Sequence, residues 1–365
     1  MKLLDAKWKL ALSGAGFGVL AVILAVMGNP KNMAICVACF IRDIAGSVGL
    51  HSAAPVQYFR PEIVGFVVGA FLISIATKEY KATAGSSPMI RFLLGFMMMI
   101  GALVFLGCPL RMIIRMAAGD LNAYVGLVGF VAGVGTGSFF LKKGFTLGRA
   151  YEVKKVNGYV LPAILVVLFI VSIATTLFTV STEGPGSMHA PVIVSLVVAL
   201  IFGALAQKNR VCFAGSIRDI FIMKNFDLIS IIGGLFVVML IFNIATGNFT
   251  FSFAGQPIAH SQHLWNILGM YVVGFAAVLA GGCPLRQLIL AGQGSSDSAI
   301  TFLGLLLGAA FAHNFGLAGA AAAAATEEAE AVAGGPATAG KVAVIACIIV
   351  LFIIAFTNKR KAAGK

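Results

Sequence analysis

Four cysteines of this chain occur in two pairs of related segments, and an arginine follows each of them closely. The pentapeptide Gly-Cys-Pro-Leu-Arg occupies residues 107–111 and again residues 282–286. Residues 36–44 and 212–220 each begin with a cysteine and end with Ile-Arg-Asp-Ile. Thiols are weak hydrogen-bond donors and arginines bind anions. These segments therefore favour a small anion that carries a soft atom.

The spacing of the cysteines indicates a duplicated unit. Cys36 and Cys212 are 176 positions apart, and Cys108 and Cys283 are 175 positions apart. Cys39 has no thiol counterpart in the second unit, so it is the cysteine that breaks the repeat.

The composition is that of a membrane protein. Hydrophobic residues make up 60% of the chain, charged residues 11%, and the mean hydropathy is +1.00. A helix needs about 20 apolar residues to cross a bilayer. We expect an all-α polytopic bundle with spanning helices near 10–28, 61–78, 88–106, 121–141, 158–181, 189–206, 226–247, 263–281, 297–315 and 341–357. Four segments are too broken to cross and are expected to be re-entrant half-helices: 31–49, 108–119, 210–223 and 283–292.

The net charge of +13 is explained by membrane topology and does not require a nucleic-acid partner. With the amino terminus in the cytoplasm, most lysines and arginines fall on the cytoplasmic side, as the positive-inside rule expects. Both termini are then cytoplasmic. Membrane lipid is an expected partner, and nucleic acid is not.

The order of the expected helices predicts two units of opposite orientation. Residues 1–145 form the first unit, residues 146–188 a connecting transmembrane helix, and residues 189–317 the second unit. Four crossings plus one is odd, so the second unit enters the membrane from the other face, as in many transporters. Residues 318–340 are an Ala/Gly-rich external linker, and residues 341–365 a final helix with a basic cytoplasmic tail.

The Cys-Pro segments are expected to open short helices. Proline suits the first helical position, which places Cys108 and Cys283 at the caps. Unpaired N–H groups at a helix start favour an anion, and Arg111 and Arg286 lie one turn further on. In the earlier segment, Pro30 is expected to begin a helix.

Two features of the earlier segments stay open. Cys36 and Cys39 are three residues apart and share a helix face. Arg42 with Asp43, and Arg218 with Asp219, are either structural ion pairs or contacts to a substrate. We expect no catalytic residue, no cofactor and no metal site.

Helix starts and arginines together with thiols select an anion that has both charge and a polarizable chalcogen atom. Thiosulfate meets this description, and so do related selenium species. We expect the thiols of both units to converge on one cavity near the middle of the bilayer.

The two Gly-Cys-Pro-Leu-Arg motifs resemble those of the YeeE/YedE family of bacterial sulfur transport proteins. Residues 29–43 are closest to its YedE branch, which is associated with selenium. The resemblance covers roughly residues 10–315. It implies an inner-membrane importer, not an enzyme, with an hourglass of back-to-back re-entrant helices. It also implies that Cys36, Cys108 and Cys283 pass the anion by S–H hydrogen bonds, with Cys212 as the counterpart of Cys36.

Alternatives to this interpretation remain. A membrane thiol-disulfide oxidoreductase would use Cys36 and Cys39 and leave Cys108 and Cys283 dispensable. A neutral-solute pore similar to aquaporins would share an Asn-Pro half-helix start, but the second unit has no such pair. A cytoplasmic sulfur- or selenium-carrier protein is a candidate partner.

Overall fold

The computed structural model describes residues 2–323 and 332–359, with side chains from residue 7 onward. Ten helices in this part of the chain are long and apolar enough to cross a membrane, and the prediction of an all-α polytopic membrane protein is confirmed. The long helices are α1 (Lys2–Val26), α3 (Pro61–Ala76), α4 (Pro88–Phe105), α6 (Leu121–Lys142), α7 (Lys155–Ala174), α8 (Val192–Lys208), α10 (Asp227–Ala245), α11 (His263–Leu279), α13 (Ser296–Asn314) and α14 (Thr338–Thr357).

The remaining elements are short. Four helices of 9 to 11 residues lie between the long ones: α2 (Val37–Ser47), α5 (Pro109–Ala117), α9 (Phe213–Met223) and α12 (Pro284–Gln293). A 3-10 turn, η1, covers Ala54–Val56. Two antiparallel strand pairs join β1 (Thr83–Ala84) to β2 (Tyr151–Glu152) and β3 (Gly319–Ala320) to β4 (Gly335–Pro336).

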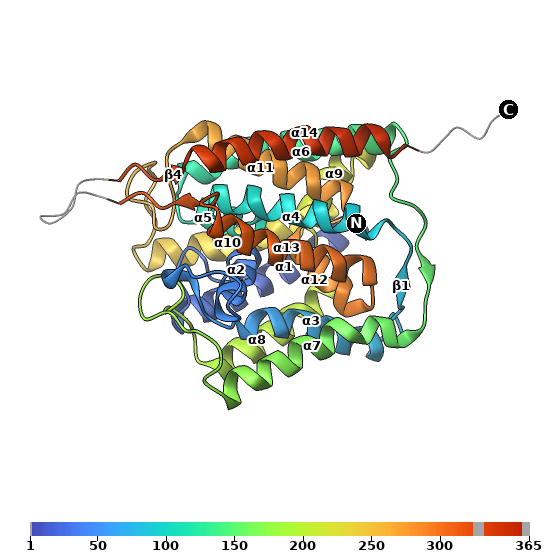
Figure 1. Ribbon diagram of the computed structural model, residues 1–365, viewed down its shortest axis with the longest axis horizontal. Helices are drawn as coiled ribbons and strands as arrows, with labels where there is room; N and C mark the ends of the chain where they lie inside the picture. Colours follow the sequence, from blue (N-terminus) through green and yellow to red (C-terminus); the bar gives the residue numbers. More distant parts are fainter. Residues whose placement is uncertain (1, 324–331, 360–365) are drawn as a thin grey trace, which may run out of the picture.

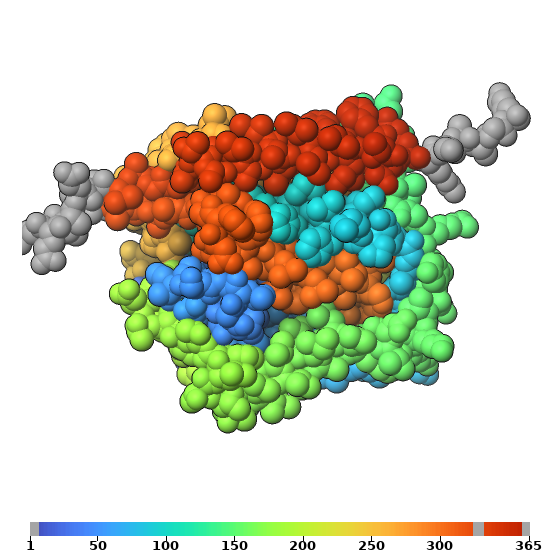
Figure 2. Space-filling model, viewed as in Figure 1, coloured from blue at the N-terminus to red at the C-terminus, as the bar shows by residue number. Residues whose placement is uncertain are grey.

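The long helices run side by side, so their connections gather at two ends of the bundle (Figure 1). β1, β2 and the turn before α13 lie at one end, where Thr83 pairs with Ser295. β3 and β4 lie at the other end. In the space-filling view, α14 forms one edge of the visible face and α7 the opposite edge (Figure 2).

Each long helix of the first unit packs mainly against a long helix of the second unit. α6 packs on α11 and α4 on α13, while α3 packs on α8 and α1 on α10. Glycines allow this close approach at matching places. A Cβ at Gly129 would lie 2.0 Å from the carbonyl oxygen of Ile267, and one at Gly304 would lie 2.1 Å from that of Phe92. Both the glycines and their carbonyl partners are 175 positions apart, as the duplication requires.

The start of the second helix differs from the expectation. Pro30 does not open a helix: it belongs to a turn in which its carbonyl accepts from the N–H groups of Met33 and Ala34. Ala34 then takes a left-handed φ of 42°, which an α-helix cannot contain. The helix therefore begins at Val37.

Two further boundaries differ from the expectation. The connecting helix α7 ends at Ala174 because Thr175 is extended and the following chain binds the loop before α3, with the Ser181 N–H donating to the Gln57 carbonyl. The described parts of residues 318–340 contain β3 and β4, and α14 begins at Thr338. Glu327, Glu328 and Glu330 lie outside the described residues.

Candidate anion-binding site

The cysteines of the repeated motifs cap short helices. Cys108 and Cys283 are the N-caps of α5 and α12, each followed by proline in the first turn, which confirms the expected caps. Cys36 and Cys212 are the N-caps of α2 and α9. In each half, the starts of two short helices therefore meet at their cysteines. Helix starts carry unpaired N–H groups and a partial positive charge.

Three thiols meet in the first half. The Sγ atoms of Cys36 and Cys39 are 3.1 Å apart, and those of Cys36 and Cys108 are 3.8 Å apart. All three cysteines are at most 1% exposed.

Two thiols meet in the second half. The Cys212 and Cys283 thiols are neighbours at the starts of α9 and α12. Gly215 occupies the place of the extra thiol, and its N–H donates to the Cys212 Sγ at 3.1 Å. Cys212 is the most exposed of the repeated cysteines, at 8%.

The thiols form two groups, one in each unit, with Cys36 beside Cys108 and Cys212 beside Cys283. Each unit builds its own group from its own two breaks. That both groups line one cavity stays a prediction. Cys347, the remaining cysteine, lies apart on α14.

Arg111 is a fully buried cation without a carboxylate partner in the described chain. Its Nε and Nη2 donate at 3.2 Å to the backbone and side-chain oxygens of Asn32. Nη1 contacts the Cys39 Sγ at 3.6 Å and donates to the Leu106 carbonyl. Nη2 also donates to the Ile258 carbonyl at 3.2 Å. All of these acceptors are neutral, so the positive charge stays uncompensated beside the thiols.

Arg286 also donates to a neutral side-chain amide, but it is less buried than Arg111. Its Nη1 donates to the Gln207 Oε1 at 3.3 Å, and no ion pair forms within the part of the chain that the structure covers. Gln207 and Asn32 are 175 positions apart, exactly as Arg286 and Arg111 are. Gln207 also donates to Glu79 at 3.5 Å, and so stands between this carboxylate and the arginine.

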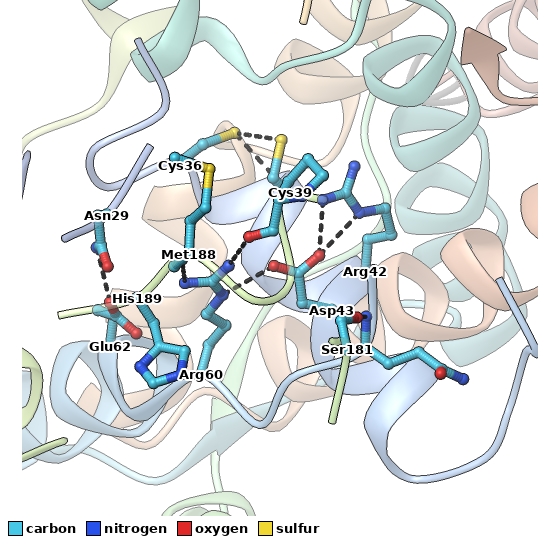
Figure 3. Close-up of polar contacts among 12 residues, drawn as sticks. Asn29, Cys36, Cys39, Arg42, Asp43, Arg60, Glu62, Ser181, Met188 and His189 are labelled. Atoms are coloured by element: carbon cyan, nitrogen blue, oxygen red, sulfur yellow. Dashed lines mark hydrogen bonds and ion pairs between the residues drawn. The ribbon is translucent and has the colours of Figure 1, made fainter. Parts of the chain in front are cut away.

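The first Ile-Arg-Asp segment forms a buried charge cluster (Figure 3). Arg42 binds the Asp43 Oδ1 at 2.6 Å, and Arg60 binds the Asp43 Oδ2 at 2.8 Å. Arg60 also donates to the carbonyls of Met188 and Pro185, which lie before α8. The cluster has one more cation than anions, and it ties α2 to the chain between the two halves.

The second Ile-Arg-Asp segment forms a simpler pair. Arg218 binds the Asp219 Oδ1 at 2.8 Å, and the Arg218 side chain is 30% exposed. In the described chain this pair has no third member. The two pairs are therefore ion pairs in the structure, and only the first is enclosed.

Several polar residues near the site were missed by the sequence analysis. Asn32 and Gln207 could have been found from their shared offset of 175. Arg60 could not, because its partner Asp43 is brought to it by tertiary folding alone. Glu62 is also fully buried; it accepts from Asn29 at 2.8 Å, and its other oxygen has no partner.

Each half brings together groups that suit an anion carrying a polarizable atom. Helix starts and an arginine without a carboxylate supply positive potential. The thiols supply polarizable atoms and weak S–H donors. No group of three or more metal-binding side chains arranged for an ion occurs within the described residues.

Comparison with known proteins points the same way. Residues 208–365 match the family described as Sulphur transport, a stretch that contains Cys212, Cys283 and both nearby arginines. The chain is 29% identical over 113 residues to the thiosulfate transporter TsuA of Spirochaeta thermophila, and 29% identical over 110 residues to that of Escherichia coli. These stretches cover 30% and 29% of this chain, and 33% and 30% of the two relatives. The chain is thus similar to this family over less than half of its length, and the matched stretches span about a third of the two relatives.

Proposed function

We propose that this multi-pass membrane protein is a transporter or facilitator, not an enzyme, that imports a small sulfur anion of the thiosulfate type. The supporting observation is the pair of arginines without carboxylates, Arg111 and Arg286, each beside thiols at helix starts. A buried charge is costly unless a counterion compensates it. A small anion that passes along the thiols supplies that counterion.

In this proposal each thiol group receives the anion in turn. Oxygen atoms of the anion bind the arginine and the N–H groups of the helix starts, and its terminal sulfur lies against the thiols. Cys36, Cys39 and Cys108 serve the first half, and Cys212 and Cys283 the second. Arg42 belongs to a cluster with one more cation than anions and raises the positive potential nearby, whereas Arg218 supports the site only as a partner of Asp219.

The asymmetric burial of the arginines suggests how the two halves divide the task. Arg111 is fully enclosed and its donors are occupied, whereas Arg286 is partly exposed and has one described partner. The second group is thus the one that an anion reaches first in this conformation. The anion reaches the first group when its oxygen atoms replace the neutral acceptors that hydrogen-bond to Arg111.

The membrane setting is part of the same proposal. We place the protein in a bacterial inner membrane with both termini in the cytoplasm, because basic residues gather in the loops assigned to that side. The opposed orientation of the two units, the re-entrant short helices and a cytoplasmic sulfur- or selenium-carrier partner also belong to it. A selenium anion of similar shape would meet the same groups, which accords with the selenium-associated branch that the sequence resembles.

A thiol-disulfide oxidoreductase is the second candidate, favoured by the 3.1 Å contact between Cys36 and Cys39. It explains the first thiol group but assigns nothing to Cys212 and Cys283. Transport accounts for both groups and is therefore preferred.

Uptake by cells tests the proposal. Cells carrying the wild type should accumulate labelled thiosulfate well above labelled sulfate. Cys108→Ala and Cys283→Ala should each lower thiosulfate uptake at least about tenfold, a barrier change of about 1.4 kcal/mol. Cys347→Ala is the matched control and should transport normally. Equal uptake of sulfate and thiosulfate by the wild type would refute the role of the thiols.

A further inference from the structure

Cys39 is the chemical difference between the two thiol groups. The Cys39 N–H donates to the Cys36 Sγ at 3.4 Å, just as the Gly215 N–H donates to the Cys212 Sγ at 3.1 Å in the second half. The backbone arrangement is therefore the same in both halves. Only the first half adds a second thiol at this place.

The second half has little room for such a thiol. A Cβ built on Gly215 would lie 3.0 Å from the Cβ of Cys212 and 3.2 Å from its Sγ. In the first half the Cys36 and Cys39 thiols are accommodated with their sulfur atoms 3.1 Å apart. A disulfide bond is about 2.05 Å long, so a shift of roughly 1 Å joins these two sulfurs.

The cap position of Cys36 makes this shift local. Cys36 has extended backbone before the first turn of α2, so its side chain leans over that turn toward Cys39. Cys108 is further from Cys36, at 3.8 Å, and belongs to a different helix. Joining Cys36 to Cys108 would require α2 and α5 to move relative to each other, whereas joining it to Cys39 requires only side-chain rotation.

We propose that Cys36 and Cys39 form an oxidisable dithiol, a modification site at which a hydroperoxide produces a disulfide that stops transport. The Cys39 sulfur attacks one peroxide oxygen, the O–O bond breaks, and one water leaves as the sulfenic acid forms. The Cys36 sulfur then attacks the Cys39 sulfur, and a second water leaves as the S–S bond forms. The two thiols together lose two electrons and two protons, and the peroxide is reduced to two waters.

The guanidinium of Arg111 lies beside Cys39, with Nη1 3.6 Å from the Cys39 Sγ. Burial keeps the resting thiol protonated, and this cation stabilises the negative charge on the Cys39 sulfur as it attacks. A small peroxide can follow any route that admits a sulfur oxyanion. The disulfide removes both S–H groups of α2 from the first thiol group and leaves only Cys108.

The loss of uptake rests on the proposed function, and so does the route by which peroxide reaches the buried thiols, but the disulfide is detected separately by its mass. In the test, purified full-length protein in liposomes is treated with hydrogen peroxide, quenched with catalase, blocked with N-ethylmaleimide after denaturation, and digested for mass spectrometry. Thiosulfate uptake is measured on the same samples. We expect a peptide with an internal Cys36–Cys39 disulfide, an uptake loss of at least tenfold, and recovery of both after dithiothreitol.

Cys39→Gly is the matched variant, because it copies the second half, and Cys39→Ser retains the side-chain volume. Each variant is compared with its own untreated sample, and peroxide should not lower its uptake below that level. A Cys36–Cys108 disulfide, or no disulfide at all, would overturn the proposal, and so would equal peroxide inactivation of wild type and Cys39→Gly. If the wild type imports no thiosulfate, the proposed function fails, while the mass spectrum still decides the modification site.

Discussion

Arg111 donates to both oxygens of Asn32 at 3.2 Å, so a neutral amide holds this buried guanidinium. A carboxylate in the same place would hold it as firmly but would cancel its charge. Gln207 occupies the same position relative to Arg286 in the second half. The repeat thus retains amides where ion pairs would be the ordinary solution for a buried arginine, as expected if the free charge binds an anion.

The first prediction concerns this neutrality. Asn32→Asp places a carboxylate on Arg111 with almost no change in shape. The KM for thiosulfate should rise at least about tenfold, which corresponds to about 1.4 kcal/mol of lost binding. Initial rates of uptake into liposomes over a range of thiosulfate concentrations measure it.

Asn32→Ala separates charge from contact. It removes the side-chain bond from Arg111 and the bond from the Asn32 amide to the Pro257 carbonyl, without adding a negative charge. Its KM should rise less than that of Asn32→Asp. If the alanine and aspartate variants behave alike, the charge of Arg111 has no part in binding.

The second prediction concerns the buried charge cluster. Arg60→Met removes one of the two cations on Asp43 and the ties to the Met188 and Pro185 carbonyls. Arg42 still pairs with Asp43, so the cost comes from the buried Asp43, Met188 and Pro185 oxygens that lose a donor, at about 1–3 kcal/mol each. The unfolding temperature of Arg60→Met in detergent should therefore fall well below that of the wild type. Arg218→Met is the control, because that pair is partly exposed and should cost about 1 kcal/mol or less. Similar losses for both variants would contradict the assignment of Arg60.

The third prediction concerns the glycines at which the two halves meet. Gly304→Ala puts a Cβ 2.1 Å from the Phe92 carbonyl oxygen, so α13 must move away from α4. Overpacking of this kind costs about 1–3 kcal/mol. Gly233→Ala on α10 has nothing within 4 Å and should unfold at or above the wild-type temperature. The comparison fails if Gly304→Ala is as stable as Gly233→Ala.

The fourth prediction is a pH dependence of stability. His260 lies in the loop before α11, donates from Nε2 to the Val104 carbonyl at 2.8 Å, and accepts the Gln262 N–H at Nδ1. Burial lowers the pKa of His260 below its usual value of 6.5, and the positive charge of Arg115 acts in the same direction. Below pH 6.5 the unfolded chain takes up a proton that the folded protein resists, so stability falls as the pH drops from 6.5 toward the folded-state pKa.

Unfolding temperatures in detergent at pH 7.5 and pH 5.5 measure this effect. The wild type should unfold at a lower temperature at pH 5.5. His260→Gln keeps a donor at this position but cannot titrate, and should lose part of the difference. The rest of the difference in unfolding temperature comes in part from His51, because burial lowers the pKa of that side chain as well. An unchanged difference in His260→Gln would show that His260 does not contribute.

Much of the architecture could be predicted from sequence because local rules dominate it. The ten long helices follow from apolar length alone, and Cys108 and Cys283 become N-caps because proline fixes the first helical turn after them. The failure at Pro30 has an equally local cause. Ala34, with its left-handed φ, ends the turn that Pro30 begins. Alanine rarely takes this conformation, so its presence at position 34 does not predict the turn.

The site was only partly predictable because tertiary contacts complete it. The cysteines and the arginines of the motifs were identified, but the sequence did not show that the thiols form two groups. The Arg60–Asp43 pair depends on how the loop before α3 folds over α2. By contrast, the amides at Asn32 and Gln207 could have been identified by extending the offset of 175 from the motifs to their neighbours.

The most direct test of the central claim is thiosulfate uptake into liposomes that contain purified wild type, Cys36→Ala or Cys212→Ala. If each half carries the anion on its own thiol group, the wild type imports thiosulfate in preference to sulfate, and each single variant loses at least about nine-tenths of that uptake. If Cys36→Ala and Cys212→Ala both import thiosulfate as fast as the wild type, the account is contradicted.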